Sequence, residues 1–208
     1  MRKWGTTKMG LFLQVAIIPE CKEDKARMFV KTVAEKYSRI LSESKVTDIK
    51  YDIVNLCPDE CVYKESANGV SVLINNRCIG YGDLAGAISE ECGKAVLVLY
   101  IYDGDYWAYE LYDNGEEIDQ FDPIPDYFGE VSEEAIQKFK GNADIIAKYF
   151  SIDRADIEKY LIFWSDTSDE KAYEDDEFEY SDWQMADFMR KLGYPYEFEE
   201  DYTGGRKD

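Results

Sequence analysis

The sequence predicts an α+β protein with a ferredoxin-like β-α-β-β-α-β core, a sheet extended by a β-meander, and a C-terminal helical region. Three observations support this fold class. Up to residue 102, short apolar runs typical of buried strands alternate with amphipathic segments typical of helices. Two dipeptides that favour tight hairpins, Asp103-Gly104 and Asn114-Gly115, follow. From residue 129 onward, apolar residues recur at helical spacing. We therefore expect a sheet region in residues 1–128 and an acidic helical region in residues 129–208, packed on it to form one compact domain.

The first half of the chain supplies the elements of the predicted core. Residues 9–18 form a nearly continuous apolar run that ends at Pro19, which is typical of a central strand. In residues 26–41 the apolar side chains lie on one face and the charged ones on the other, which predicts a helix. The remaining core elements are strands expected at 48–56, 70–74 and 95–102, a helix at 82–92, and an irregular segment at 57–69 that contains an Asn68-Gly69 turn.

The second half begins with hairpins and continues with helices. Asp103 and Asn114 are interpreted as turn residues rather than calcium ligands, because a strand-like aromatic segment separates them and no uninterrupted binding loop is present. Strands are expected at 105–112 and 116–121, and two prolines make 122–130 a rigid connector. Helices are expected at 133–139, at 142–150, at 156–164 and after a Ser181/Gln184 capping box, and Gly193 should end the last one.

The charge of the chain is concentrated in its second half. Residues 1–100 carry 13 acidic and 14 basic side chains, whereas residues 101–208 carry 31 acidic and 10 basic ones. Such a surface repels phosphates and anionic lipids and attracts positively charged proteins. We therefore expect a basic protein partner, and neither nucleic acid nor membrane.

Several classes of chemistry are excluded or disfavoured by composition. The chain has no histidine, which excludes His-based acid–base catalysis and His-ligated metals. Five cysteines do not form a secreted disulfide framework. A zinc site built from Cys57, Cys61, Cys78 and Cys92 would lack the paired short spacings of zinc ribbons, so free thiols and no cofactor are expected. The apolar run near the N-terminus is short and is followed by no cleavage site, so we expect a cytoplasmic location.

Motifs of the second half resemble a group of bacterial cytosolic proteins of unassigned function. The motifs are "DGDYWAYELYDNGEEIDQFDPIPDYF", "GNADIIAKYF", "IEKYL" and "SDWQMADFMRKLGYPY". The resemblance covers roughly the C-terminal half and implies no activity. In size, acidity and mixing of aromatic with acidic residues, the whole chain is also loosely similar to bacterial toxin-immunity proteins, which implies inhibitory binding to a toxin.

The favoured function is that of a non-enzymatic acidic protein-binding module, comparable to an immunity-type inhibitor of a bacterial toxin. Aromatic anchors and acidic side chains would contact a basic surface. The competing interpretation is that rings on alternating strands are buried and that the acidic run is a solvated loop. The candidate interaction residues are Trp107, Tyr109, Asp122, Asp126, Tyr127, Glu174, Asp175, Asp176 and Glu177.

Two other functions remain open at this point. A carboxylate-dependent enzyme could use Asp103 with Asp105, or Asp122 with Asp126, as an acid–base pair if one carboxyl were desolvated. A nucleic-acid mimic would need its carboxylates in a regular row, whereas these acids occur mainly at turns and helix caps.

Overall fold

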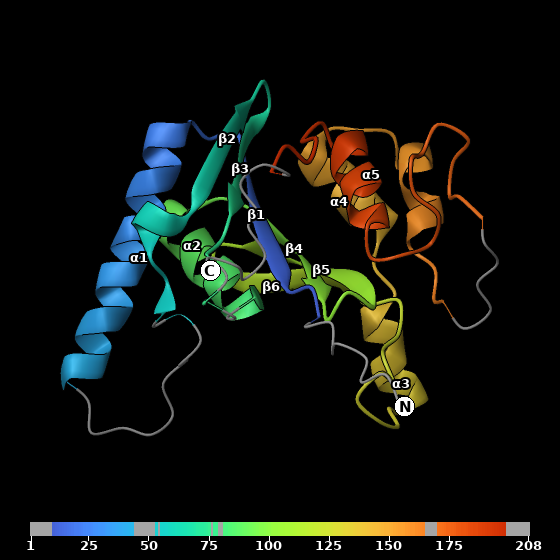
Figure 1. The fold of residues 1–208 in the computed structure, drawn as a ribbon, viewed down its shortest axis with the longest axis horizontal. Coiled ribbons are helices and arrows are strands. Elements are labelled where there is room, and N and C mark those ends of the chain that lie inside the picture. Colours follow the sequence, from blue (N-terminus) through green and yellow to red (C-terminus); the bar gives the residue numbers. More distant parts are fainter. Residues whose placement is uncertain are drawn as a thin grey trace, which may run out of the picture.

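The fold is α+β and contains a six-stranded antiparallel sheet (Figure 1). The computed structural model describes residues 10–43, 53, 55–75, 77–78, 81–164 and 170–198. The strands are β1 (Leu13–Pro19), β2 (Val62–Ser66), β3 (Gly69–Leu73), β4 (Val96–Tyr102), β5 (Tyr106–Asp113) and β6 (Glu116–Phe121). They lie in the order β2-β3-β1-β4-β5-β6, and every neighbouring pair is antiparallel.

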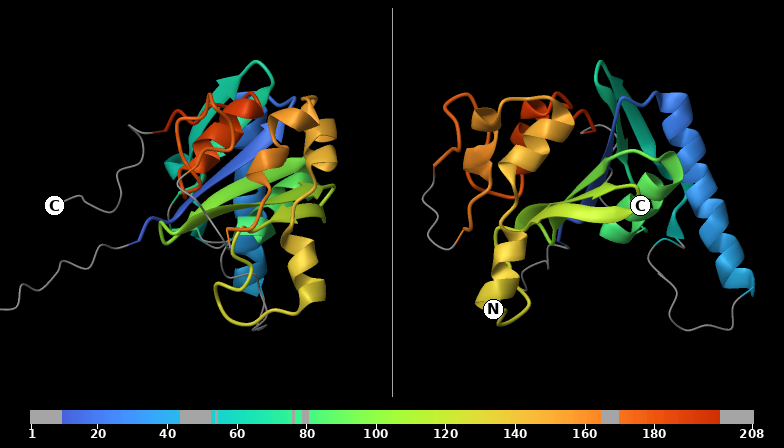
Figure 2. Two further views of the ribbon diagram at one scale, coloured as in Figure 1. Left: turned by 90° about the vertical axis from the view of Figure 1, so that its right-hand side faces the viewer. Right: turned by 180° about the vertical axis from the view of Figure 1, so that it is seen from behind.

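Helical elements lie on both sides of this sheet. One side carries α1 (Glu23–Glu43) and α2 (Tyr81–Cys92), while the C-terminal elements lie on the opposite side (Figure 2, right). The later helices are α3 (Glu133–Ile136), α4 (Ala143–Phe150) and α5 (Gln184–Lys191). Short 3-10 turns occur at Pro58–Glu60, Gln137–Phe139, Arg154–Asp156 and Glu158–Tyr160. Among the described residues, no helix is both long enough and apolar enough to cross a membrane.

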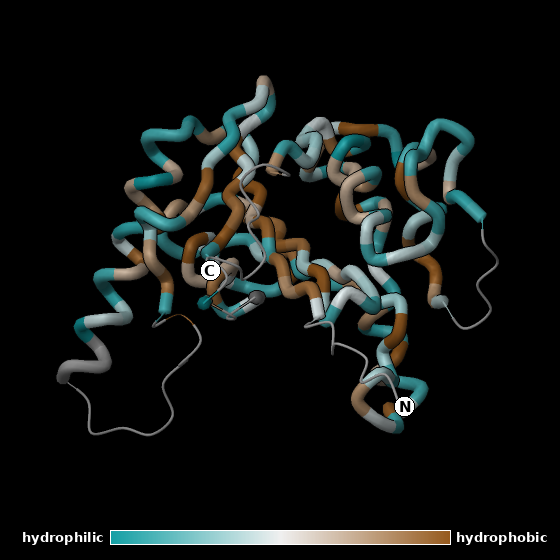
Figure 3. The backbone as a smooth tube through the Cα atoms, viewed as in Figure 1, coloured by the Kyte–Doolittle hydropathy of each residue, from teal (hydrophilic) through white to brown (hydrophobic). Residues whose placement is uncertain are grey.

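The central strands are buried on both faces, as their continuous apolar sequences predict. Along β1, Val15 and Ile17 pack toward the C-terminal elements, whereas Ala16 and Ile18 pack toward α1 and α2. All four side chains are at most 1% exposed. Figure 3 shows the hydrophobic segments gathered along these strands. The sheet therefore separates two apolar cores, each closed by a different part of the chain.

The core on the C-terminal side is rich in aromatic rings. Trp107 and Tyr109 of β5 pack on Phe188 of α5, with ring centroids 5.0 and 5.8 Å apart. The indole Nε1 of Trp107 also donates a hydrogen bond to Oε1 of Gln184, at 3.2 Å. Both β5 rings are fully buried. Trp107 and Tyr109, which we listed as candidate interaction residues, are therefore core residues and present nothing to a partner.

The second strand of the core lies elsewhere than the sequence predicts. It is β2, inside the segment 57–69 that we expected to be irregular. Of the strand expected at 48–56, residues 48–52 and 54 lie outside the described residues, and 53, 55 and 56 are not in a strand. β2 is an edge strand with polar side chains on most positions, and Tyr63 is its one buried residue. A half-exposed edge strand lacks the apolar run by which buried strands are recognised.

The predictions for the turns and for the end of α5 are confirmed, whereas two predictions for helices are wrong. Asp103 and Asn114 have positive φ with their following glycines, as predicted, and Gly193 ends α5 with a φ of 83°. The Ser181/Gln184 capping box is wrong, because α5 has no side-chain cap and Gln184 is buried against Trp107. The helix expected at 156–164 is also wrong: a 3-10 turn at Glu158–Tyr160 takes its place.

Shortening Phe188 tests whether the C-terminal elements hold the sheet. We expect Phe188→Ala to lower the free energy of unfolding by about 3–5 kcal/mol, since the ring fills a buried site between two β5 rings. Phe128→Ala is the matched control, because this ring is 73% exposed, and should change stability by less than about 0.5 kcal/mol. Equilibrium denaturation of both variants measures the difference. Equal, small effects would show that the C-terminal elements contribute little to the fold.

Candidate functional site

Five aromatic rings form a cluster, here called the aromatic patch, at the end of the sheet where β4 turns into β5; Tyr106 is its buried base, and the other rings reach the surface. Within it, ring centroids are 5.1 Å apart for Phe12 and Tyr102, 5.1 Å for Tyr102 and Phe128, and 5.2 Å for Tyr106 and Tyr127. The described residues include five exposed large hydrophobic side chains, and three of them are in this patch: Phe128, Phe12 and Tyr127, at 73%, 39% and 37% exposure. Grouped exposure of this kind is typical of a contact surface.

Three segments that are distant in the sequence meet to form the patch. The β4–β5 turn depends on the positive φ of Asp103 and Gly104, and the amide of Gly104 donates to the carbonyl of Leu11 at 2.9 Å. This bond brings Phe12 beside the turn. The connector after β6 contributes Tyr127 and Phe128, whose backbone is shaped by tight turns.

Asp122, a predicted interaction residue, shapes the connector. Its Oδ1 accepts a hydrogen bond from the amide of Ile124 at 2.8 Å, and its own amide donates to the carbonyl of Phe139 at 3.0 Å. The side chain is half-buried, and burial raises the pKa of its carboxyl. Asp122 therefore helps to hold the loop that presents Tyr127.

Carboxylates border the aromatic patch. Asp103, Asp105 and Asp126 are all exposed. The Tyr127 hydroxyl donates to Oδ2 of Asp105 at 2.5 Å, and this hydrogen bond raises the pKa of Tyr127 to about 12. The tyrosine therefore remains a protonated donor at neutral pH, and it orients one carboxylate of the border. Of the predicted interaction residues, Asp126 and Tyr127 lie at this surface.

Asp182 lies beside the β4–β5 turn and directly precedes a residue that lines a cavity. It is half-buried, and burial raises the pKa of its carboxyl, with a smaller contribution from the charge of Asp105. One of its oxygens lies 4.0 Å from where a Cβ on Gly104 would be. The next residue, Trp183, lines a cavity of about 620 Å³. We call this cavity the aromatic–acidic pocket; it is lined by Asp175, Asp176, Glu177, Phe178, Trp183, Ala186, Asp187, Arg190, Pro195 and Tyr196.

An ionic network that includes two buried carboxylates forms the wall of this pocket. Asp176 and Asp187 are 4% and 3% exposed, and the Arg190 guanidinium lies 3.2 and 3.1 Å from their carboxylates. Asp176 also accepts hydrogen bonds from the Tyr160 hydroxyl at 2.5 Å and from the Tyr173 amide at 2.9 Å. Each buried charge therefore has several partners, as burial of a carboxylate requires.

Asp187 fixes the backbone of the acidic run. It accepts hydrogen bonds from the amide of Glu177, at 2.9 and 3.0 Å, and from the amide of Phe178, at 2.8 Å. The four acids at 174–177, which we predicted to be interaction residues, therefore have different roles. Asp175 pairs with Lys191 at 2.8 Å and with Arg190 at 3.1 Å, and these hydrogen bonds, that of Lys191 first, lower the pKa of Asp175 to about 2. Glu174 and Glu177 are exposed.

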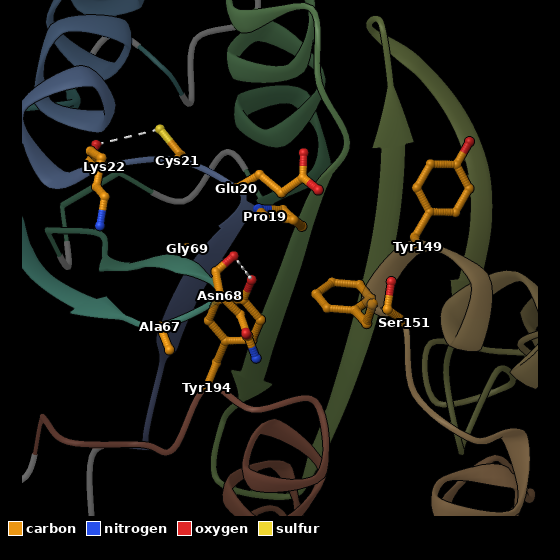
Figure 4. A pocket seen from close by; sticks show the side chains of 11 residues that line it. Pro19, Glu20, Cys21, Lys22, Ala67, Asn68, Gly69, Tyr149, Ser151 and Tyr194 are labelled. Atoms are coloured by element: carbon orange, nitrogen blue, oxygen red, sulfur yellow. Dashed lines mark hydrogen bonds between the residues drawn. The ribbon is translucent and has the colours of Figure 1, made fainter.

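A further cavity, of about 440 Å³, lies where the end of β1 and the β2–β3 turn face α4 (Figure 4). The protein itself engages several of its polar groups. The Tyr194 hydroxyl donates to the carbonyl of Asn68 at 2.8 Å, and the Tyr149 hydroxyl donates to Asp113 at 2.8 Å. The thiol of Cys21 donates to the carbonyl of Lys22, and burial raises its pKa, so it is not an activated nucleophile.

Neither of the two acid pairs considered for catalysis lies in the cavities described above. Neither Asp103 with Asp105 nor Asp122 with Asp126 lines either of these two cavities. Within the part of the chain that the structure describes, no group of three or more His, Cys, Asp or Glu side chains could hold a metal ion. All five cysteines are free thiols, and burial raises the pKa of Cys61 to about 12.

Comparison with protein-family models, with curated proteins and with solved structures found no match to this chain.

Sequence reasoning missed several residues of this surface. Phe12 and Phe128 belong to the aromatic patch, and Trp183 to the pocket, yet we assigned no binding role to any of them. A usable signal was the position of Phe128, which follows two prolines and lies in a connector outside any predicted strand or helix. Aromatic residues in such loops have no neighbouring element to bury them.

Removing Asp187 tests whether this ionic network holds the acidic run in place. We expect Asp187→Ala to lower the free energy of unfolding by about 3 kcal/mol, because two part-buried hydrogen bonds from backbone amides and the ion pair with Arg190 are lost. Asp175→Ala removes a carboxylate whose side chain is 59% exposed, and it should have a much smaller effect. Chemical denaturation of both variants provides the comparison, and equal losses would contradict the assigned roles.

Two strand carboxyls give the protein a pH-dependent stability. Glu110 and Asp119 are half-buried, and burial raises the pKa of each. The Glu110 carboxylate lies so close to Gly82, in the first turn of α2, that a side chain at residue 82 would overlap it, and it accepts from the Tyr112 hydroxyl at 2.9 Å. Asp119 accepts from the Tyr109 hydroxyl at 2.6 Å.

We expect the free energy of unfolding to rise as the pH is lowered from neutral toward the ordinary carboxyl values of 4.5 and 3.8. A carboxyl whose pKa is raised by folding binds more protons in the folded chain than in the unfolded one. Its stabilising contribution is therefore complete below the unfolded pKa and is lost as the pH rises through the folded pKa. Glu110→Gln should flatten the pH profile, whereas Glu116→Gln, at an exposed position, should not. Thermal unfolding across this pH range measures both, and a Glu110→Gln profile identical to wild type would refute the assignment.

Proposed function

We propose that this protein is a non-enzymatic binding protein for a basic protein partner, acting as an immunity-type inhibitor of a toxin. The observation that carries the proposal is the aromatic patch: exposed rings of Phe12, Tyr127 and Phe128 bordered by carboxylates. Binding surfaces commonly combine an aromatic centre with a polar rim. The border here is acidic, as is the whole second half of the chain.

The two parts of the surface have different physical roles in this proposal. The rings supply apolar area that is removed from water on binding, which stabilises the complex. The carboxylates of Asp103, Asp105 and Asp126 attract a positively charged partner and speed its encounter. Because the Tyr127 hydroxyl is bonded to Asp105, one anchor ring and one charge are already held in place before binding.

We also propose that the scaffold is ferredoxin-like and that the protein acts in the cytoplasm. The order β2-β3-β1-β4, with α1 and α2 on one face, supports the first statement, and β5 and β6 then extend that sheet. Five free cysteines support the second, because such thiols persist in reducing compartments.

Binding of an arginine-rich peptide tests the surface directly. We expect wild-type protein to bind the peptide with an affinity that falls steeply as salt is added. Phe128→Ala should weaken binding about tenfold or more, since exposed aromatic anchors commonly contribute that much. Met28→Ala is the control, because Met28 is 54% exposed on α1 and lies outside the patch. Isothermal titration calorimetry measures each affinity. Equal binding by both variants, or binding insensitive to salt, would remove the proposal.

Photo-crosslinking in cells of the source organism identifies the partner itself. A photoreactive amino acid placed at residue 128 should capture a basic protein that the same group at residue 28 does not capture. Capture of acidic proteins alone, or the same products from both positions, would contradict a basic partner at the aromatic patch.

A further inference from the structure

The aromatic–acidic pocket has the dimensions of a ligand site and continues the surface proposed for binding. Its volume of about 620 Å³ falls within the range of about 300–1,000 Å³ that is typical of such sites. Asp182, which lies beside the β4–β5 turn, directly precedes Trp183 of the pocket. A partner that covers the aromatic patch would therefore reach the pocket through neighbouring residues.

Aromatic faces make up one part of the lining. The Trp183 ring lies with its centroid 5.4 Å from that of Tyr196, in an edge-to-face arrangement, and 6.3 Å from that of Phe178. Trp183 is half-exposed, so part of its indole is accessible from the pocket. The faces of such rings carry partial negative charge and attract cations, the indole most strongly.

Among the charged residues of the lining, the Glu177 carboxylate is available to pair with a ligand. Arg190 is engaged by Asp175, Asp176 and Asp187, so the cation of the wall is already matched by three acids. Glu177 is exposed, and among the described residues no salt bridge engages its carboxylate. Its backbone is held by Asp187, which keeps it at the pocket. An anionic ligand would meet this excess of carboxylates and be repelled.

We propose that the aromatic–acidic pocket receives an alkyl-linked cation, namely the guanidinium or ammonium group of an arginine or lysine side chain of the partner. The cation lies against the Trp183 ring and pairs with the Glu177 carboxylate. The inference rests on the proposed function, which it deepens by naming the group that is recognised. The loop is preorganised for this role, because the Asp187 carboxylate fixes the backbone of Glu177 and Phe178 before any ligand arrives.

Nuclear magnetic resonance with defined probes tests the pocket. The Trp183 indole N–H signal, assigned from a Trp183→Phe variant, is followed while Nα-acetyl-arginine amide is added to the full-length protein. We expect this signal to shift, and the neutral isostere Nα-acetyl-citrulline amide to leave it in place. Glu177→Gln should weaken binding about two- to fivefold, and Trp183→Leu about tenfold as read from neighbouring signals. Glu174→Gln, an exposed acid of the same run outside the lining, should match wild type.

The possible results distinguish a failure of the pocket inference from a failure of the function proposed for the aromatic patch. The inference is overturned if the citrulline amide causes the same shifts, if Glu177→Gln and Glu174→Gln both match wild type, or if the Trp183 signal responds to neither the free amide nor the arginine-rich peptide. If the free arginine amide binds at least as tightly as the arginine-rich peptide, the inference that the cation belongs to a protein partner is wrong, and the pocket binds a small cationic ligand. Peptide binding that depends on Phe128 but not on Trp183 would refute the pocket and leave the proposed function standing.

Discussion

The structure depends on one constraint: the central strands are apolar on both faces, so both faces must be covered. In β1, Val15 and Ile17 point to one side and Ala16 and Ile18 to the other, and water is excluded from all four. Helices α1 and α2 can close only one side. The other is closed by the C-terminal elements, whose Phe188 packs on the rings of β5. The acidic second half of the chain therefore supplies the apolar side chains that close one of the two cores.

Because acidic segments pack against the core, some carboxylates are buried, and burial of an unpaired charge is destabilising. In this fold the buried carboxylates share ion-pair and hydrogen-bond partners. Arg190 serves Asp176 and Asp187, while backbone amides and the Tyr160 hydroxyl complete their hydrogen bonds. The same bonds immobilise the acidic run. The energetic requirement of burying two charges thus produces a rigid loop at the rim of a pocket, and rigidity of this kind reduces the entropy lost on binding.

The surface that results is divided between charge and aromatic area. Carboxylates that pair with Arg190 or Lys191 act less strongly on a partner, because a neighbouring cation offsets part of their field. What matters is where exposed carboxylates and exposed rings coincide, which happens at the aromatic patch and, through Asp182 and Trp183, at the neighbouring pocket. Net charge predicts the sign of a partner, and the local arrangement decides where it binds.

By itself, the sequence determined the features that depend on near neighbours: the buried strands, the left-handed turns at Asp103 and Asn114, the end of α5 at Gly193, and the two acidic segments that hold Tyr127 and Glu177. The tertiary structure alone decided which member of a similar pair is buried. Trp107 and Phe128 both lie among acids in the sequence, yet one is in the core and the other is 73% exposed; Asp176 and Glu177 are adjacent, yet one is enclosed and the other faces water. The physical reason is that burial is set by contacts between segments far apart in the chain, such as α5 on β5, and no local pattern of residues encodes where such a segment will lie.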